Sequence, residues 1–417
     1  MNAAPAELLE LVDGAFRQER PGHIGVAVSG GSDSLALLML ARTWARQNGI
    51  TVSAVTVDHG LRREAGDEAQ MVAGICSDRK IPHDIVKWHG WDGAGNLQAE
   101  ARQARYRLIA DWATRTGVSH VLLGHTADDQ AETFLIRLAR EAGVDGLSAM
   151  QAKRVIEGVV FLRPLLAARR GALQSYLRGL GVDWVSDPSN EDRRFQRVRV
   201  RDQLAALAPL GIDADVLCAV VRHQQSAREA LQLQTLAAAR KIARTDHGDV
   251  LFDADAMREL PAEIRRRLLV QALKWVATAF YGPRHQALEK LEAALQSGKK
   301  STLHGCVIGS EGQAFRVTRE YRAVQDKFAD VDAVWDGRWS LKGPEKRNLE
   351  VRALGPAGIL HCPDWRETGR PRHSVLASPS LWRGSEFIAA PLAGAPRGWQ
   401  AQLAAGEDHF FTSVLSH

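Results

Sequence analysis

The sequence predicts an α/β fold, an open parallel sheet with helices on both faces, followed by a helical domain and a small α+β C-terminal domain. Three observations lead to this prediction. Between about residues 22 and 190, short β-type runs alternate with amphipathic helical stretches, a pattern typical of parallel sheets. From about 206 to 296, Ala, Leu, Gln and Arg dominate and strand signals are few. Beyond that point, β-type runs return together with frequent Gly and Pro.

The length of the chain indicates several domains. Single hydrophobic cores stop growing at roughly 250–300 residues, and this chain has 417. We therefore place domains at residues 1–205, 206–325 and 326–417, the second mostly helical and the third of a fold that the sequence leaves open.

The first domain begins with alternating strands and helices. The strands are expected at residues 24–28, 51–57, 83–87 and 118–123, and the helices at 33–47, 67–79, 97–116 and 128–140. In the third of these helices the apolar residues recur at helical spacing, as Ala101, Ala104, Leu108 and Trp112 illustrate. That face of the helix is therefore predicted to pack on the sheet.

The composition excludes several classes of protein. The apolar and charged fractions, 45% and 25%, are ordinary for a globular protein and indicate neither disorder nor membrane residence. No apolar stretch reaches the roughly 20 residues of a bilayer span, and no signal-peptide pattern opens the chain. We therefore expect a cytoplasmic protein with no membrane partner. The net charge of +5 is compatible with a polyanionic partner.

The four cysteines, Cys76, Cys218, Cys306 and Cys362, lie far apart in the sequence. Because no Cys-x-x-Cys pair is present, the pattern argues against a zinc site, an iron–sulfur cluster and dithiol redox chemistry. We expect reduced thiols that are buried in cores.

A Ser-Gly-Gly-Ser-Asp-Ser stretch that begins at Ser29 separates the first predicted strand from the first helix. Gly30 and Gly31 lack Cβ atoms, which lets backbone N–H groups approach an anion closely. Ser32 and Ser34 add hydroxyl donors, and the helix that follows presents the positive end of its dipole. The stretch therefore predicts a site for a multiply charged phosphate, although the Walker A pattern is absent.

Asp33 is unexpected in a phosphate loop, because a carboxylate beside phosphates repels them unless a divalent cation lies between. We therefore predict that Asp33 is a ligand of Mg²⁺. The ordinary alternative is that Ser32 or Asp33 only caps the helix and that the glycines form a plain turn.

With all six positions matched, SGGSDS resembles the PP-loop of the N-type ATP pyrophosphatases, which split ATP between its α and β phosphates and transfer AMP to an oxygen of the substrate. The resemblance implies a PP-loop, HUP-like α/β fold for the first domain. Five further stretches narrow the family: AVTVDHGLRREAGDEA, NLQAEARQARYRLIADWA, LGHTADDQAETFLIRLAREAGVDGLSAM, FLRPLL and WVSDPSNEDRRFQRVRVR. Together they resemble the tRNA(Ile)-lysidine synthetases over about the first 200 residues, with a weaker similarity in STLHGCVIGSEGQAFRVTRE.

This resemblance implies a reaction and its partners. In that family, the C2 carbonyl oxygen of the wobble cytidine in the CAU anticodon of tRNA(Ile) attacks ATP, which gives an adenylated base and pyrophosphate. The ε-amine of free L-lysine then attacks C2, AMP leaves, and lysidine is formed. We expect a carbon–nitrogen ligase that uses ATP and Mg²⁺, with residues 1–205 as the catalytic domain and 206–325 as the tRNA-binding domain. The sequence leaves the oligomeric state open, with a homodimer as one option.

The predicted ATP site comprises the six loop residues and two histidines. A loop that grips the β and γ phosphates stabilises the departing pyrophosphate and leaves the α phosphorus open to attack. His59 follows the second strand, where the adenosine is expected, and His125 precedes the acidic stretch. The alternatives are a strand-ending turn at His59 and a structural histidine at position 125.

Three acids, Asp128, Asp129 and Glu132, share one region of a helix surface because they lie three or four positions apart. They are predicted to bind Mg²⁺ or the lysine ammonium, and the resemblance favours Asp129 and Glu132 as contacts of lysine or of the base. The alternative is that early acids only complement the helix dipole. With Asp33 and Arg105, we expect Asp129 and Glu132 to be the catalytic residues.

Arg105 lies in the EARxxRY motif, on the side of its helix away from the apolar face. It is predicted to neutralise charge at the α phosphate and to contact the adenylated base. A solvated helix face is the alternative.

The run RRFQRVRVR at the end of the first domain is predicted to contact tRNA phosphates, which supply affinity without reading sequence. A solvated basic edge is the alternative. The predicted contacts are Arg193, Arg194, Arg197, Arg199 and Arg201.

The chain departs from the family pattern at three places. The usual Gly-His-His is Gly-His-Thr, ending at Thr126; the usual Arg-Gly after the acidic helix is Arg-Glu, ending at Glu141; and an expected Arg-Asn pair ends at Val198. None lies in the phosphate loop, so these departures bear on substrate contacts more than on the class of reaction.

Three rival functions stay open at this point. A PP-loop tRNA thiolase, or another adenylating tRNA-modifying enzyme, shares the loop, but thiolases typically need paired or catalytic cysteines. A small-molecule synthetase of the amide-forming kind has no evident use for a basic helical module. A nonenzymatic nucleotide-binding protein does not need the acids or Arg105.

Overall fold

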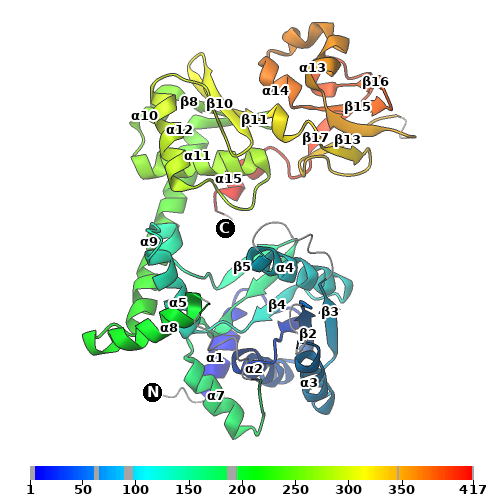
Figure 1. Cartoon of the computed structure of the whole chain (residues 1–417). Coiled ribbons are helices and arrows are strands. Elements are labelled where there is room, and N and C mark those ends of the chain that lie inside the picture. The colour runs from blue at the N-terminus through cyan, green and yellow to red at the C-terminus, as the bar shows by residue number, and fades with distance from the viewer. Residues whose placement is uncertain are drawn as a thin grey trace. The chain divides into compact units, whose positions relative to one another are not determined.

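The computed structural model describes residues 5–60, 65–88, 97–185, 194, 196–344 and 347–415. The chain divides into two compact units, Met1–Arg228 and Glu229–His417 (Figure 1). Helix α9 (Ala214–Ile242) begins in the first unit and ends in the second. The domain boundaries that we placed at residues 205 and 325 stay predictions.

The first unit is built on a six-stranded sheet in the part of the chain that the structure describes. Its strands are β1 (His23–Ala27), β2 (Thr51–Asp58), β3 (His83–Lys87), β4 (His120–Leu123), β5 (Lys153–Ile156) and β6 (Val159–Leu162), in the order β3-β2-β1-β4-β6-β5. All neighbours pair in parallel except β5, which pairs antiparallel with β6. The predicted open parallel sheet is confirmed.

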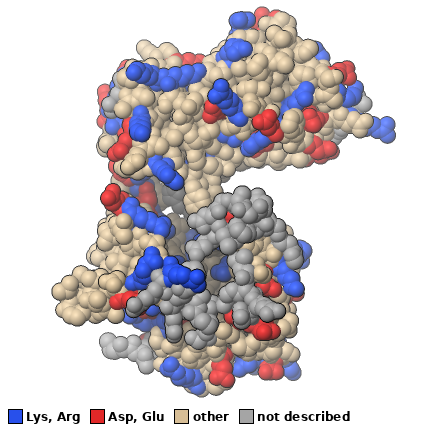
Figure 2. Space-filling model, in the orientation of Figure 1, with Lys and Arg blue, Asp and Glu red and all other residues tan. Residues whose placement is uncertain are grey.

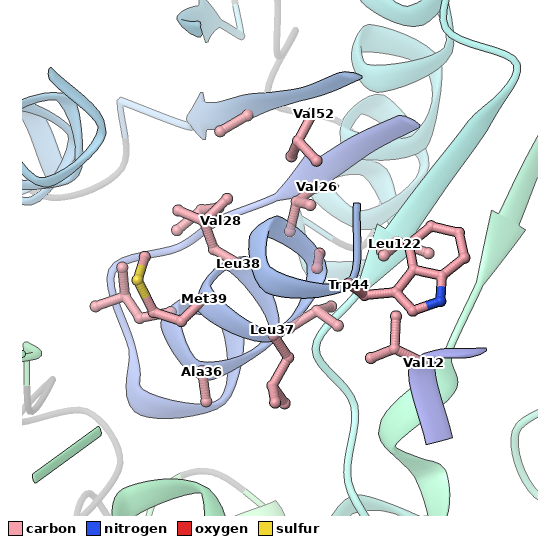
Figure 3. Packing of buried hydrophobic residues seen from close by; sticks show 14 of the residues in the cluster. Val12, Val26, Val28, Ala36, Leu37, Leu38, Met39, Trp44, Val52 and Leu122 are labelled. Carbon is pink, nitrogen blue, oxygen red and sulfur yellow. The ribbon is translucent and has the colours of Figure 1, made fainter. Parts of the chain in front are cut away.

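Helices cover both faces of this sheet. They are α1 (Pro5–Ala15), α2 (Ser32–Asn48), α3 (Ala65–Asp78), α4 (Leu97–Arg115), α5 (Ala127–Leu138), α6 (Val144–Leu147), α7 (Arg170–Gly179) and α8 (Gln196–Leu207), with the 3-10 turn η1 (Pro164–Ala167) before α7. One core joins the sheet to α1, α2, α3 and α7, and a second core on the opposite face joins it to α4. Figure 3 shows part of the first core, where Leu37, Leu38 and Trp44 of α2 lie among side chains of α1 and the strands.

The second unit combines helices with antiparallel sheets. Its helices are the end of α9, α10 (Ala254–Glu259), α11 (Ala262–Ala277), α12 (His285–Gln296), α13 (Gly355–Gly358), α14 (Arg372–Leu376) and α15 (His409–Ser413). Its strands are β7 (Ala243–Asp246), β8 (Asp249–Asp253), β9 (Ser301–Leu303), β10 (Cys306–Glu311), β11 (Ala314–Arg319), β12 (Phe328–Asp330), β13 (Trp339–Lys342), β14 (Glu350–Ala353), β15 (Pro379–Arg383), β16 (Glu386–Ala389) and β17 (Gln400–Leu403). They form sheets in the orders β7-β8-β11-β10-β9, β12-β14-β15-β16 and β13-β17.

The end of the chain returns to the core of the helical region. Phe410 of α15 is fully buried in the cluster that joins α9, α11 and α12 to the five-stranded sheet. Ser413 of the same helix accepts a hydrogen bond from the side chain of Gln271 on α11. Residues 326–417 therefore share a core with the helical region in addition to having apolar clusters of their own.

Several features of the fold are absent from the sequence predictions, among them strands β5 and β6, helix α1 and the β7–β8 hairpin. Helix α1 buries Leu8 and Val12 completely, with Phe16 just beyond its end, so its apolar residues recur every fourth position. The β7–β8 hairpin turns at His247 and Gly248, whose φ angles are both positive, 47° and 83°. Two-residue hairpin loops commonly need this backbone.

No single helix in the described ranges is long and apolar enough to span a membrane, and one pair, Gln196–Leu210 with Ala214–Ile242, meets that criterion only when both helices are joined across a 97° bend.

Candidate active site

The phosphate loop connects β1 to α2 and leaves the start of that helix open. The cap position of α2 is Gly31, in extended conformation and without a side-chain hydrogen bond, so neither Ser32 nor Asp33 caps the helix. Gly30 has a φ of 83°, which an L side chain rarely adopts. The loop therefore presents the first-turn N–H groups and the positive end of the helix dipole without a competing cap.

Ser34 holds the loop together from inside. Its Oγ accepts a hydrogen bond from the backbone N–H of Ser29 at 3.1 Å and donates one to the carbonyl oxygen of Gly31 at 3.0 Å. The two hydroxyls of Ser29 and Ser34 are 3.2 Å apart. Of the predicted hydroxyl donors, Ser34 thus fixes the shape of the loop.

Asp33 is mostly buried and faces a cation of the protein itself. Its Oδ1 accepts a hydrogen bond from the hydroxyl of Ser32 at 3.1 Å, and its Oδ2 accepts one from Nε of Arg170 at 2.8 Å. Burial raises the pKa of Asp33, an effect that Arg170 opposes. The carboxylate is therefore held at the loop by a guanidinium.

Gly124, at the end of β4, lets the acidic helix start close to the phosphate loop. A Cβ atom at Gly124 would lie 2.9 Å from the carbonyl oxygen of Asp33 and 2.9 Å from the backbone N and Cα of Ser34. Real Cβ atoms essentially never approach backbone so closely. Strand β4 and the first turn of α2 thus touch through backbone, which brings the two motifs together.

The start of α5, in contrast, is fully capped. The backbone N–H and the hydroxyl of Thr126 both donate to Oδ2 of Asp129 at 2.9 Å, while Thr126 Oγ1 accepts from the backbone N–H of Asp129 at 3.4 Å. This capping box satisfies two otherwise unpaired donors. Although burial raises the pKa of Asp129, Arg170 and the Thr126 backbone lower it below its ordinary value. Asp129 is therefore a fixed, ionised carboxylate.

Glu132 lies one turn further along α5 and is fully buried. Its Oε1 accepts from Nε of Arg201 at 2.9 Å, but its Oε2 is buried and has no hydrogen-bond partner among the described residues. Burial raises the pKa of Glu132, partly offset by Arg201. Because buried polar atoms are normally paired, Oε2 is an open acceptor.

Arg170, the first residue of α7, is the functional residue that the sequence analysis missed. Its guanidinium reaches Asp33 at 2.8 Å, Asp129 at 3.2 Å and Glu132 at 3.8 Å. Its backbone N–H donates to Oδ2 of Asp128 at 2.7 Å. The signal in the sequence is weak: Arg170 follows soon after the FLRPLL motif. The nearest of the acids that its side chain contacts, Glu132, is 38 residues away (170 − 132), so spacing alone does not link them.

The basic run at the end of the first domain meets the same acids. Arg201 contacts Glu132 at 2.9 Å, and Arg197 lies 3.9 Å from Asp129. Arg199 donates to the backbone carbonyl of Arg194 at 3.2 Å. Arg193 lies outside the described residues. On the face that Figure 2 shows, Lys and Arg are interspersed with Asp and Glu among the described residues of both units.

Asp128 has cationic partners as well. Its Oδ1 is 3.3 Å from the side chain of Arg169, which also contacts Asp215 at 3.1 Å. All four predicted acids of the site are therefore paired with arginines of α8, of the first turn of α7 or of the cap position before α7. The described ranges contain no cluster of three or more His, Cys, Asp or Glu arranged to hold a metal ion by themselves.

Arg105 and His59 form a second group. Nε and a terminal nitrogen of Arg105 lie 3.2 Å and 3.1 Å from Nε2 of His59. Burial and the nearby Arg105 lower the pKa of His59 to about 4, so this histidine is neutral at pH 7 and accepts from the guanidinium. The structure thus pairs a histidine predicted in the ATP site with an arginine predicted to be catalytic, 46 residues apart.

His125 is a neutral, incompletely paired histidine. Burial and the charge of Arg163 lower its pKa to about 3, and its Nδ1 has no hydrogen-bond partner in the described part of the chain. Arg163, from the FLRPLL motif, donates to the hydroxyl of Tyr106 at 2.9 Å and to the carbonyl of Gln151 at 2.7 Å. The motif arginine is therefore a buried structural partner of the EARxxRY helix.

Comparison with known proteins identifies the chain. A family model described as a PP-loop domain matches residues 6–208, which is the class that the open α2 start and the parallel sheet define. The chain is 48% identical over 412 residues to the tRNA(Ile)-lysidine synthase of Ruegeria pomeroyi, covering 99% of this chain and 98% of that protein. It is 35% identical over 328 residues to the enzyme of the same name from Wolbachia pipientis wMel, covering 76% of each.

This chain belongs to the tRNA(Ile)-lysidine synthase family. Among solved structures, the U34-tRNA thiolase NcsA from Methanococcus maripaludis aligns with 53% of this chain and 78% of its own at 16% identity, with a TM-score of 0.46. The fold class, the resemblance and the expectation of an ATP-using ligase are confirmed.

Proposed function

We propose that this protein ligates L-lysine to C2 of the wobble cytidine in the CAU anticodon of tRNA(Ile), through an adenylated cytidine, with release of pyrophosphate and AMP. One observation supports the assignment of roles. The uncapped start of α2 lies against the capped start of α5, whose acids are paired with arginines. The name that these relatives carry supports the lysidine product.

The loop from Ser29 to Ser34 holds the leaving group. Its backbone donors and the α2 dipole attract the β and γ phosphates, and pyrophosphate then departs without disturbing the α phosphorus. The cytidine oxygen attacks that phosphorus, the bond to pyrophosphate breaks, and AMP becomes attached to the base. In this proposal Arg105, whose guanidinium contacts neutral His59, neutralises charge that develops on the α phosphate.

Mg²⁺ fits this site through its preference for one or two carboxylates together with phosphate oxygens. Asp33 supplies a buried carboxylate at the loop, and Asp129 shares the same guanidinium with it. Bound Mg²⁺ would neutralise phosphate charge. In our proposal Asp33 is its protein ligand, and the arginine that now contacts Asp33 gives way when the phosphates bind.

The acids of α5 serve the lysine step. Asp129 stays ionised and attracts the ε-ammonium, whereas Glu132 has the raised pKa and the open Oε2 that suit a proton acceptor. Glu132 takes one proton from the ammonium, the neutral amine attacks C2, and AMP leaves. Asp128, bound by Arg169 and by the α7 backbone, lies at the edge of this group.

The tRNA is the remaining partner. In our proposal Arg194 and Arg199 contact tRNA phosphates, and residues 206–325 also bind the tRNA. Arg197 and Arg201 contact catalytic acids in the free protein, so we assign them to the junction between tRNA and active site. A cytoplasmic location and a homodimer stay predictions.

The thiolase alternative is disfavoured by the thiols themselves. All four cysteines are free and buried. Burial raises the pKa of Cys76 and Cys218 to about 11 and that of Cys306 to about 12. A thiolate nucleophile needs a lowered pKa and access.

Labelled lysine tests the proposal. Purified protein with Mg·ATP is expected to release pyrophosphate only with tRNA(Ile) that carries CAU, and to transfer labelled lysine to that tRNA. A transcript with the wobble cytidine replaced by uridine is the control. Pyrophosphate release with no lysine in the tRNA would favour another adenylating enzyme, and ATP binding without tRNA-dependent release would favour a nonenzymatic protein.

A further inference from the structure

One side chain, that of Arg170, contacts acids of both halves of the site. We propose that Arg170 is a positioning residue that couples the Mg·ATP site at Asp33 to the lysine site at Asp129 and Glu132. This inference rests on the proposed function. It is based on three distances: the guanidinium of Arg170 lies 2.8 Å from Asp33, 3.2 Å from Asp129 and 3.8 Å from Glu132.

Each of these acids has another donor, but the other donors differ. Asp33 is bound by the hydroxyl of Ser32, Asp129 by Thr126, and Glu132 by Arg201. Arg170 is the partner that all three share. A planar guanidinium with several fixed N–H groups makes such a bridge, and a lysine ammonium cannot reproduce it.

The backbone that carries Arg170 is firmly placed. Its N–H donates to Asp128 at 2.7 Å, which fixes the first turn of α7 against α5. Leu173 and Leu177, further along α7, are fully buried in the core that contains α2. The guanidinium can therefore move while its backbone stays, so that a change at one acid is transmitted to the other two.

Both incoming substrates compete for the contacts of Arg170. Mg·ATP brings a cation to Asp33 and phosphates that attract the guanidinium, and lysine brings an ammonium to Asp129 and Glu132. The substrate that binds first spends part of its binding free energy on displacing Arg170. The second substrate then binds without that free-energy cost. The two sites should therefore show positive coupling, and linkage makes that coupling reciprocal.

Equilibrium binding of lysine tests the coupling. Labelled lysine is titrated into the complex of the full-length protein with CAU-bearing tRNA(Ile), with and without saturating Mg²⁺ and an ATP analogue that cannot be cleaved between the α and β phosphates. In the unmodified protein we expect the analogue to tighten lysine binding by about fivefold or more, the size typical of coupled sites.

Two variants locate the effect at Arg170. In R170Q the analogue should change lysine affinity by less than about twofold. R170K keeps the charge but not the bridge, so it should retain less than half of the coupling factor. R178Q is the matched control, because Arg178 lies on the exposed side of the same helix, over the ring of Trp184.

The outcomes separate this inference from the proposed function. Unchanged coupling in R170Q or R170K, or no coupling in the unmodified protein, would overturn the inference while leaving lysine binding intact. No lysine binding to any form would instead overturn the proposed function, and the inference with it. Melting temperatures of R170K and R178Q identify variants that are folded, so loss of coupling in folded R170K supports the inference even where R170Q unfolds.

Discussion

Helices α2 and α5 start at the ends of neighbouring parallel strands, yet their first turns are built in opposite ways. Helix α2 begins at Gly31 without a side-chain cap. Helix α5 begins at Thr126 with a complete capping box. Because β1 and β4 pair directly and Gly124 touches the first turn of α2, these two starts share one edge of the sheet.

The charges around the two starts differ accordingly. The first turn of α5 carries Asp128 and Asp129, and arginines hold both acids. The loop before α2 consists of Ser29, Gly30 and Gly31, and Asp33 is the acid in the first turn of that helix. One start is thus suited to an anion and the other to a cation. In the proposed function, this difference separates departing pyrophosphate from an incoming amine at one edge of the sheet.

Removing the carboxylate of Asp33 from the start of α2 should have the largest effect. Asp33→Ala is expected to lower the rate of tRNA-dependent pyrophosphate release by roughly 10²–10³-fold, because the Mg²⁺ that would neutralise the phosphates loses its proposed protein ligand. Initial rates of pyrophosphate formation measure this. Asp111→Ala, on the exposed side of α4, is the control, and near-normal turnover of Asp33→Ala would remove Asp33 from the site.

A change among the acids of α5 should separate the two half-reactions. Glu132→Gln keeps the size of the side chain but removes both the proposed proton acceptor and its charge. Loss of a charge-assisted contact to the lysine ammonium, about 1.5–3 kcal/mol, corresponds to an increase in KM for lysine of roughly 10–100-fold, and lysine incorporation should slow as well. The KM for ATP should change by less than about threefold. Steady-state kinetics with each substrate varied measure both, and equal effects on the two constants would refute the division of roles.

The close backbone contact between Gly124 and the start of α2 can be disrupted by adding a side chain. Gly124→Ala places a Cβ atom 2.9 Å from the backbone of Asp33 and Ser34, and strain of about 1–3 kcal/mol is expected from such overpacking. The KM for ATP should rise about tenfold and the melting temperature should fall. Gly74→Ala in α3, with nothing within 4 Å of its new Cβ atom, is the control. An unaltered ATP constant would show that the two starts are independent.

Removing the cap of α5 should have the smallest effect. Thr126→Ala loses the donor to Asp129 and should lower the free energy of unfolding by about 1 kcal/mol. Thr126→Ser keeps the hydroxyl and should restore most of that stability. Urea unfolding of the two variants measures the difference, and equal stability would mean that the cap hydroxyl is not needed.

Local patterns were sufficient to predict much of the first unit. The strands at residues 51–57 and 83–87 and the helix at 97–116 agree with β2, β3 and α4 to within one residue at each end, because alternation of apolar runs is a local property. The β7–β8 hairpin was missed although His247-Gly248 is a turn signal, since the surrounding Ala, Leu and Arg favoured helix.

By itself, the sequence determined the glycine- and serine-rich loop, the acids of α5 and the family, because these depend on residue types at short, fixed spacings. The tertiary structure decided the partners of those acids. Arg170 is 137 residues from Asp33 and Arg201 is 69 from Glu132. Such ion pairs depend on how α7 and α8 pack against the sheet edge. The spacing of residues along the sequence does not predict that packing.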